Sequence, residues 1–167
     1  EAGLAYGLRT QGYLNQRSQI TVRMLAWEER TIDADFWHER LNAAIARRAG
    51  LAADPGTDCY RLVYAESDGL PGLVVDRYGA WLVLQALTLG IDIRKQELAE
   101  RLLALTGARG VYERSDVDVR PREGLQDAVG LLAGDEPPAA VIVHEQGLAF
   151  EVDLRAEYRA HVLDYFS

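Results

Sequence analysis

Three acidic side chains near the middle of the chain are the first candidates for chemistry. Glu66 and Asp68 lie in the stretch ESDGLPG, and Asp76 follows in LVVDRYG. Carboxylates that converge in space can bind a metal ion or exchange protons with a substrate. The glycines and the proline of the same stretch instead favour a tight turn, in which Asp68 accepts hydrogen bonds from backbone N–H groups. The turn is the favoured interpretation, and the carboxylate site is its alternative.

Two groups of residues carry cations that could contact a nucleic acid. In NQRS, Asn15 and Arg17 have the side-chain types that commonly contact RNA phosphate, although a solvated sheet edge explains them equally well. In YERSD, Arg114 stands between two acids at the end of an expected strand, where α/β proteins often bind ligands. A local ion pair is the alternative there. The candidate RNA-binding residues are therefore Asn15, Arg17 and Arg114.

Composition limits these possibilities. The chain has 18 basic and 26 acidic residues, a net charge of −8 and a pI near 4.9, so RNA binding would depend on a local basic patch and not on whole-molecule charge. The single cysteine, Cys59, excludes an internal disulfide framework, and without a nearby histidine it is expected to be an inert, partly buried thiol. The three histidines show no metal-ligand spacing, so no metal site is expected.

No apolar run reaches the length of a membrane span, and the first residues do not resemble a signal peptide. A cytoplasmic location without membrane contact is therefore expected. Spacing and side-chain chemistry alone name no reaction.

The first third of the chain predicts a small sheet followed by a helix. In SQITVRML, Ile20, Val22 and Met24 alternate with polar residues, which indicates a half-buried strand. An amphipathic helix is expected from Asp33, the predicted N-cap, with Gly50 as its stop. The stretch LAADPGTD reads as a linker.

The remainder predicts alternating strands and helices. RLVYAE is an expected strand, and LVVDRY and WLVLQAL form a hairpin around Gly79 and Ala80. Asp92 is the predicted cap of a helix that ends at Gly107, followed by a strand in GVYERSD. REGLQDAVGLLAG is expected to be a turn or short helix, and AAVIVHEQGLAFEVDL a hairpin turning at 145–147. This order predicts a mixed α+β unit and not a regular doubly wound sheet.

The stretches RLVYAESDGLPGLVVDRYG, YERSDVDVRPREGL and FEVDL together resemble the central domain of bacterial RNA cytosine-5 methyltransferases of the large-subunit methyltransferase I type. The upstream GYLNQRSQITVRML is similar to the last strands of that family's PUA barrel. The resemblance implies a partial PUA-like barrel at 1–30, a connecting helix and linker at 31–56, a central α+β domain at 57–156, and at 157–167 the start of a Rossmann-like methyltransferase domain.

The resemblance also implies a reaction and a cofactor. The family transfers a methyl group from S-adenosylmethionine to C5 of a cytosine in 23S ribosomal RNA, after a cysteine thiolate adds to C6. VLDYFS is similar to the family's first cofactor-binding strand, which makes Asp164, Tyr165, Phe166 and Ser167 the candidate cofactor-binding residues. No residue of this chain, Cys59 included, matches the family's catalytic cysteine motif.

Departures from the family pattern indicate part of a longer enzyme. After FEVDL the family continues with Gly-Gln-Lys-Thr-Gly-Phe, whereas this chain has RAEYRAHVLDYFS, and the last motif stops before its glycine loop. We therefore expect accessory domains that orient ribosomal RNA and are inactive alone. A non-catalytic RNA-binding adaptor is the alternative, and a relative acting on another RNA or on a small molecule is a third. A homodimer is left open.

Overall fold

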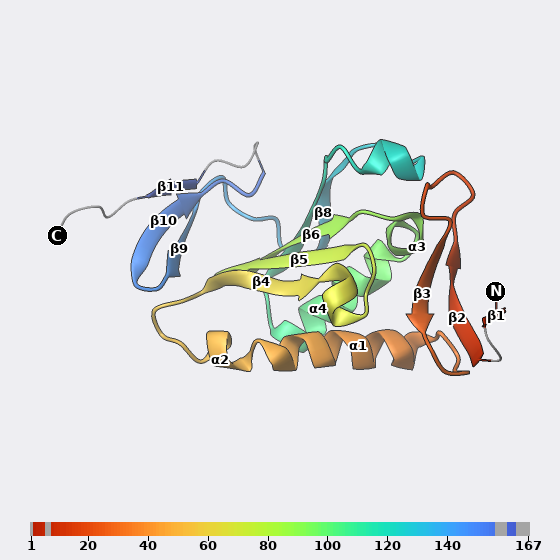
Figure 1. The fold of residues 1–167 in the computed structure, drawn as a ribbon. Helices are drawn as coiled ribbons and strands as arrows, with labels where there is room; N and C mark the ends of the chain where they lie inside the picture. Colours follow the sequence, from red (N-terminus) through yellow and green to blue (C-terminus); the bar gives the residue numbers. More distant parts are fainter. Residues whose placement is uncertain (1, 6–7, 156–159, 163–167) are drawn as a thin grey trace.

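The structure is a computed structural model that describes residues 2–5, 8–155 and 160–162. Its centre is a five-stranded sheet in the order β4–β5–β6–β7–β8 (Figure 1). The strands are β4 (Cys59–Tyr64), β5 (Leu73–Tyr78), β6 (Trp81–Ala86), β7 (Gly110–Ser115) and β8 (Ala128–Gly134). Neighbouring strands are antiparallel except β6 and β7, which are parallel because a helical crossover joins them. The expected mixed α+β class is confirmed.

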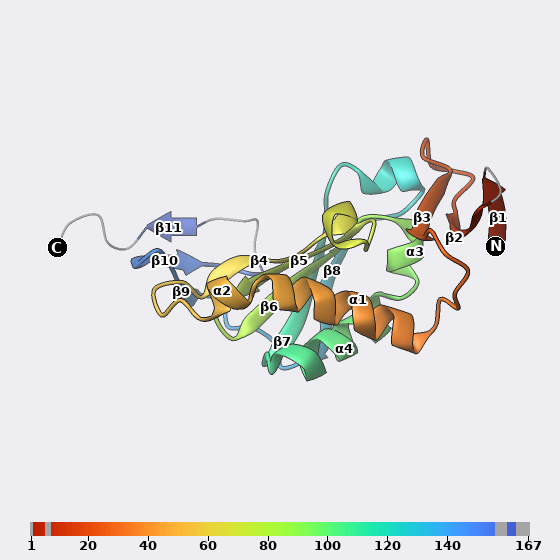
Figure 2. The ribbon, with the colours of Figure 1, turned by 60° about the horizontal axis from the view of Figure 1, so that its bottom comes forward.

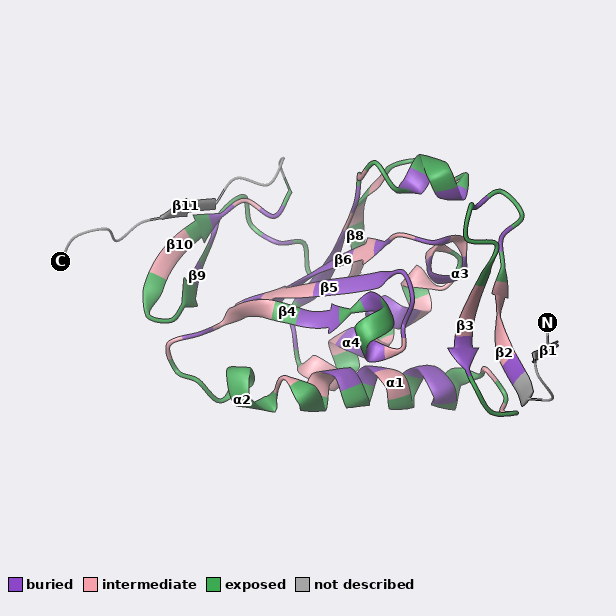
Figure 3. Ribbon diagram, viewed as in Figure 1, coloured by how far each residue is buried: buried purple, intermediate pink, exposed green. Residues whose placement is uncertain are grey.

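Helices α1 (Ala34–Arg47) and α4 (Lys95–Thr106) cover one face of this sheet (Figure 2). The apolar positions of both helices recur at three- and four-residue steps, so each helix buries one side in the main core. Asp33 caps α1 as predicted, because its carboxylate accepts the N–H of Phe36 at 3.0 Å. In Figure 3 the outer side of α1 is exposed, while β5 and β6 are largely buried between the layers.

A small sheet packs against part of the other face of the central sheet. It contains β9 (Val141–Glu145), β10 (Leu148–Val152) and β11 (Ala160–Val162). Apolar side chains from β9 and β10 form a second core with those of β5 and β6, namely Tyr78, Trp81, Val83, Val141, Val143 and Val152. The predicted turn is confirmed, since Gln146 and Gly147 both have positive φ between β9 and β10.

The N-terminal strands form a separate three-stranded antiparallel sheet at the other end of the molecule. Its strands are β1 (Ala2–Ala5), β2 (Leu8–Leu14) and β3 (Val22–Ala26), and Figure 1 shows them beside α3 (Leu89–Asp92). The end of β3 meets the main core, into which Leu25 and Ala26 are buried. The β2–β3 loop lies next to the 3₁₀ turn η2 (Arg120–Glu123).

Four sequence expectations are corrected. The strand in SQITVRML begins at Val22, and Ile20 and Val22 are exposed whereas Met24 is half-buried, so burial increases only toward the end of the strand. Gly50 lies inside the short helix α2 (Ala49–Ala52), since α1 already ends at Arg47 with Arg48 as its C-cap.

The other two corrections concern the second half of the chain. Asp92 ends α3 and does not cap α4, because its carboxylate pairs with Lys95 and Arg120. REGLQDAVGLLAG contains the strand β8 as well as a turn, because pairing with β7 supplies its hydrogen bonds. Most of VLDYFS, from Leu163 onward, lies outside the described residues.

Candidate functional site

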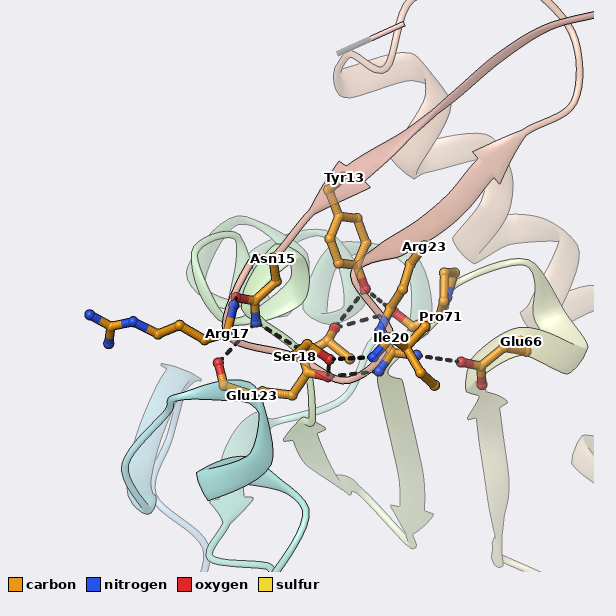
Figure 4. A network of polar contacts seen from close by, with 10 residues as sticks. Tyr13, Asn15, Arg17, Ser18, Ile20, Arg23, Glu66, Pro71 and Glu123 are labelled. Carbon is orange, nitrogen blue, oxygen red and sulfur yellow. Dashed lines mark hydrogen bonds and ion pairs between the residues drawn. The ribbon is translucent and has the colours of Figure 1, made fainter. Parts of the chain in front are cut away.

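A buried carboxylate joins the N-terminal sheet to the central domain. Glu123, in η2, accepts hydrogen bonds from Ser18 Oγ, from Arg23 Nη2 at 2.8 Å and from Asn15 Nδ2 at 3.0 Å (Figure 4). Asn15 Nδ2 also donates to the Glu123 backbone oxygen at 2.9 Å. We call Asn15, Ser18, Arg23 and Glu123 the Glu123 network. It holds the β2–β3 loop against η2.

Hydrogen bonds keep the Glu123 carboxylate ionised. Its side chain is only 3% exposed, and burial alone would raise its pKa. The hydrogen bonds from Ser18, Arg23 and Asn15, with the charge of Arg23, outweigh burial and lower the pKa of Glu123 below its ordinary value. The network is therefore an internal ion pair with its acceptor positions filled.

Tyr13 makes a second attachment between the two parts. Its hydroxyl donates to the Pro71 backbone oxygen at 2.9 Å and lies 2.7 Å from Thr88 Oγ1. Burial is the main reason that the pKa of Tyr13 is raised to about 12, so the hydroxyl remains a donor. Its ring packs directly on Gly90, where a β-carbon would fall 2.6 Å from ring atoms. Only glycine at position 90 leaves room for this contact.

The ESDGLPG stretch is a structural turn, as favoured from the sequence. It forms the 3₁₀ turn η1 (Ala65–Asp68), ended by Gly69 at φ 69°. Asp68 accepts the N–H of Tyr64 at 2.7 Å and ion-pairs with Arg47 and Arg48 of α1. Asp68 therefore accepts a backbone N–H as expected and also binds two arginines of the helix, which the sequence did not predict.

The three carboxylates of the alternative interpretation do not converge. Asp68 is occupied as described, and these hydrogen bonds lower its pKa even though burial alone would raise it. Asp76 pairs across the strands with Arg61 at 2.8 Å, and the exposed Glu66 lies 3.6 Å from Arg23. No group of potential metal ligands occurs within residues 2–5, 8–155 and 160–162.

The structure separates the predicted RNA-binding residues. The Asn15 amide is buried. Its nitrogen donates to Glu123, and its oxygen accepts the backbone N–H of Arg17 at 3.1 Å, so Asn15 positions the loop. Arg17 is exposed, and its guanidinium points away from the network (Figure 4). Its stem crosses Gly124, where a β-carbon would lie 2.8 Å from Arg17 Cδ.

Arg114 lies elsewhere, in a local ion pair. Its Nε and Nη2 contact Asp116 at 3.1 and 2.9 Å, and its Nη1 lies 3.5 Å from the Leu154 oxygen. The hydrogen bond from Arg114 lowers the pKa of Asp116. Arg114 lines a hollow of about 300 Å³ on the sheet face opposite the helices, with Asp76, Tyr78, Val83, Gln85, Asp116, Val117 and Leu154. Its RNA contact stays a prediction, and the ion-pair alternative is observed.

The remaining predicted residues divide between described and undescribed parts of the chain. Cys59 is half-buried, and burial raises the pKa of its thiol to about 12, which fits an inert thiol. Glu113 pairs with Lys95 at 2.9 Å. Asp164, Tyr165, Phe166 and Ser167 lie outside the described residues.

Sequence reasoning missed Tyr13, Ser18, Arg23 and Glu123. Each contact of Glu123 with the loop spans a hundred or more positions, so no local pattern could reveal it. The weak signal available was the Glu-Gly pair at 123–124, since a glycine ends a turn at positive φ.

No family model matches the chain. Curated relatives are named Ribosomal RNA large subunit methyltransferase I: the chain is 44% identical to the Vibrio cholerae protein over 137 residues, and 44% identical to the Photobacterium profundum protein over 145 residues. These matches cover 82% and 86% of this chain but 34% and 36% of the relatives. The chain is a relative of ribosomal RNA large subunit methyltransferase I. It spans about a third of the length of the curated proteins with that name.

Two solved structures share the fold of this large-subunit methyltransferase I relative. One is a proposed SAM-dependent methyltransferase from Streptococcus mutans, with a TM-score of 0.75 and 17% identity over 89% of this chain and 38% of its own. The other is a proposed methyltransferase complexed with SAH, with the same TM-score and identity and 37% of its own chain covered. No helix in the described ranges is long and apolar enough to cross a membrane.

Proposed function

We propose that the protein takes part in S-adenosylmethionine-dependent methylation of ribosomal RNA, with C5 of a cytosine in 23S ribosomal RNA as the methyl acceptor. The observation that carries this proposal is the 44% identity to ribosomal RNA large subunit methyltransferase I over 137 residues. The fold shared with a proposed methyltransferase complexed with SAH supports the cofactor.

The described residues are proposed to orient RNA. The three N-terminal strands are proposed to be part of a PUA-like barrel at 1–30, joined by 31–56 to the central domain at 57–156. Arg17 and Arg122 are exposed on the two segments that the Glu123 network holds together, and neither has a carboxylate partner among the described residues. Two cations on neighbouring, connected segments suit contact with RNA phosphates.

Catalysis is proposed to reside outside these residues. Cys59 is a poor nucleophile, because a thiol with a pKa of about 12 is almost entirely protonated near neutral pH. S-adenosylmethionine would supply the methyl group, and Asp164, Tyr165, Phe166 and Ser167 remain the proposed cofactor-binding residues. Because no step can be assigned to the described residues, this chain is expected to be inactive alone.

A non-catalytic RNA-binding adaptor is the competing function. The raised pKa of Cys59 favours this function as well, since the described residues then supply cations for RNA but no reactive thiol. In either case we propose ribosomal RNA as the partner and the cytoplasm as the location. A homodimer stays a prediction.

Methyl transfer distinguishes the two functions. The complete gene product is incubated with S-adenosylmethionine carrying a labelled methyl group and with unmodified 23S ribosomal RNA, and the RNA is then digested to nucleosides. If the protein is the methyltransferase, the label should appear in 5-methylcytidine. RNA binding without any label in the RNA would support the adaptor and contradict the enzyme.

A further inference from the structure

A groove lies between the ESDGLPG turn and the edge of β3 that pairs with no other described strand. It has a volume of about 460 Å³ and opens to solvent, and the Glu123 network borders it through Arg23. We call it the Trp27 groove. Its lining residues are Ile20, Val22, Arg23, Met24, Leu25, Trp27, Arg40, Glu66, Gly69 and Pro71.

One wall of the groove is unusually apolar for a solvent-exposed surface. Ile20, Val22 and Trp27 are 56%, 52% and 68% exposed. Ile20 and Val22 are two of the three side chains that the alternating pattern of SQITVRML was expected to bury. A contiguous exposed apolar patch of this kind marks a binding surface. The indole of Trp27 also offers a flat face on which a nucleic-acid base can stack.

The groove also contains a cation that no carboxylate neutralises. Arg40 has no acidic partner among the described residues, and its buried Nε makes no hydrogen bond there. Its remaining contacts are weak, with Nη2 lying 3.4 Å from the Leu25 oxygen and the guanidinium 5.1 Å from the Phe36 ring centre. Most other arginines in this acidic chain pair with Asp or Glu, so Arg40 retains capacity for an anion.

Glu66, the carboxylate that lines the groove, does not neutralise Arg40. Glu66 is 67% exposed and lies 3.6 Å from Arg23, not from Arg40. Arg23 in turn is neutralised by the buried Glu123. The groove therefore combines an apolar wall, an aromatic face and one free guanidinium.

We propose that the Trp27 groove binds one unpaired nucleotide of the RNA substrate, with its base stacked on Trp27 and its phosphate at Arg40. This inference rests on the proposed function in RNA binding. A protein strand added to β3 would cover the apolar wall but leave the Arg40 charge without an anion. A base-paired nucleotide could not present a free face to Trp27, because that face is stacked within the duplex.

Tryptophan fluorescence tests the groove directly, because Trp37 and Trp81 are only 2% and 6% exposed whereas Trp27 is 68% exposed. The protein is titrated with a mixed-sequence single-stranded oligoribonucleotide and, separately, with the same strand annealed to its complement. We expect the single strand, and not the duplex, to quench the exposed tryptophan. Trp27→Ala should abolish the quenching and weaken binding about tenfold.

Arg40→Gln should weaken binding of the single strand about fivefold while leaving the fold intact by circular dichroism. Arg155→Gln is the matched control, since it makes the same charge change at a residue that pairs with Glu136 and does not line the groove, and it should alter affinity less than twofold. Trp27→Phe, which keeps an aromatic face, should retain most of the affinity if Trp27→Ala fails to fold.

The outcomes separate this inference from the proposed function. Salt-dependent binding of the single strand without quenching, unaffected by Trp27→Ala and Arg40→Gln, would overturn the groove as the binding site and leave RNA binding standing. Equal quenching by the duplex would overturn the requirement for an unpaired nucleotide. Failure to bind either RNA would overturn the groove, whereas the proposed function is tested separately by methyl transfer to 23S ribosomal RNA.

Discussion

At the scale of single residues, Glu123 determines how the N-terminal loop meets the central domain. A carboxylate that is 3% exposed is stable only when its charge is paired and its oxygens accept hydrogen bonds. Arg23 supplies the charge, and Ser18 and Asn15 supply further donors. Replacing the acid leaves the buried part of Arg23 without its partner.

Glu123→Gln should lower the free energy of unfolding by about 3 kcal/mol at pH 7, the usual cost of breaking a buried ion pair. Urea denaturation measures the change. Glu136→Gln is the control, since Glu136 is 58% exposed and lies 3.6 Å from Arg155, and it should cost less than about 1 kcal/mol. Equal losses in both variants would contradict the buried ion pair.

The same carboxylate predicts a pH dependence. Because the pKa of Glu123 is lower in the folded protein than its ordinary value of 4.5, the unfolded chain binds the proton more readily. Its contribution to stability is therefore complete above pH 4.5 and is lost as the pH falls through the folded pKa. The stability difference between the native protein and Glu123→Gln should be constant near neutral pH and shrink in acid. A stability difference that grows in acid would contradict a lowered pKa of Glu123 in the folded protein.

Sequence reasoning succeeded for residues whose partners are local. Asp33 was predicted as a cap and acts as one, and the turn interpretation of Asp68 is confirmed. It failed where partners are distant in sequence, as for Glu123 and Tyr13. Asn15 was chosen for its chemistry, but its donors are used internally by a residue that only the fold brings near.

At the scale of elements, the η1 turn is attached to α1 through one acid. Asp68 accepts two hydrogen bonds from Arg48, one of them from Nη2 to Oδ2 at 2.8 Å. It also forms an ion pair with Arg47. Asp68→Asn keeps the side-chain shape but removes the charge, so we expect a loss of about 3 kcal/mol in urea denaturation. Asp135→Asn is the control, because Asp135 and Arg109 are both mostly exposed and should contribute little.

The contact between β2 and α3 depends on a glycine, Gly90, whose lack of a side chain leaves room for the Tyr13 ring. Gly90→Ala would place a β-carbon 2.6 Å from the Tyr13 ring, so we expect destabilisation by about 2 kcal/mol from overpacking. Gly50→Ala is the matched control, because nothing lies within 4 Å of its β-carbon and alanine favours a helix. Thermal unfolding should show a lower midpoint for Gly90→Ala and an unchanged or higher one for Gly50→Ala. A neutral Gly90→Ala would contradict close packing of the two elements.

Elements with strong local signals were predicted best. The hairpins at 79–80 and 145–147 follow from their turn residues, and both are present. β8 was missed because its sequence AVGLLAG does not alternate apolar and polar residues and its pairing with β7 is a tertiary contact. Ile20 and Val22 were predicted to be buried because alternation identifies two faces of a strand without showing which residues meet the core.

At the scale of the whole molecule, a net charge of −8 coexists with a local capacity for anions. Most arginines are paired with acids within the described residues. Arg17 and Arg122 beside the Glu123 network, and Arg40 in the Trp27 groove, lack such partners there and border the junction of the N-terminal sheet with the central domain. Arg77 and Arg94 also lack them, and each donates to a backbone oxygen instead. RNA is therefore expected to bind at this junction, with an affinity that depends on few phosphates.

The salt dependence of RNA binding tests this account most directly. The dissociation constant of the protein for a 23S ribosomal RNA fragment is measured at several salt concentrations for the native protein, Arg17→Gln and Arg155→Gln. We predict weaker binding and a slope of log affinity against log salt that is shallower by about one unit for Arg17→Gln alone. Identical slopes for all three proteins, or no salt-dependent binding at all, would contradict RNA binding at the junction.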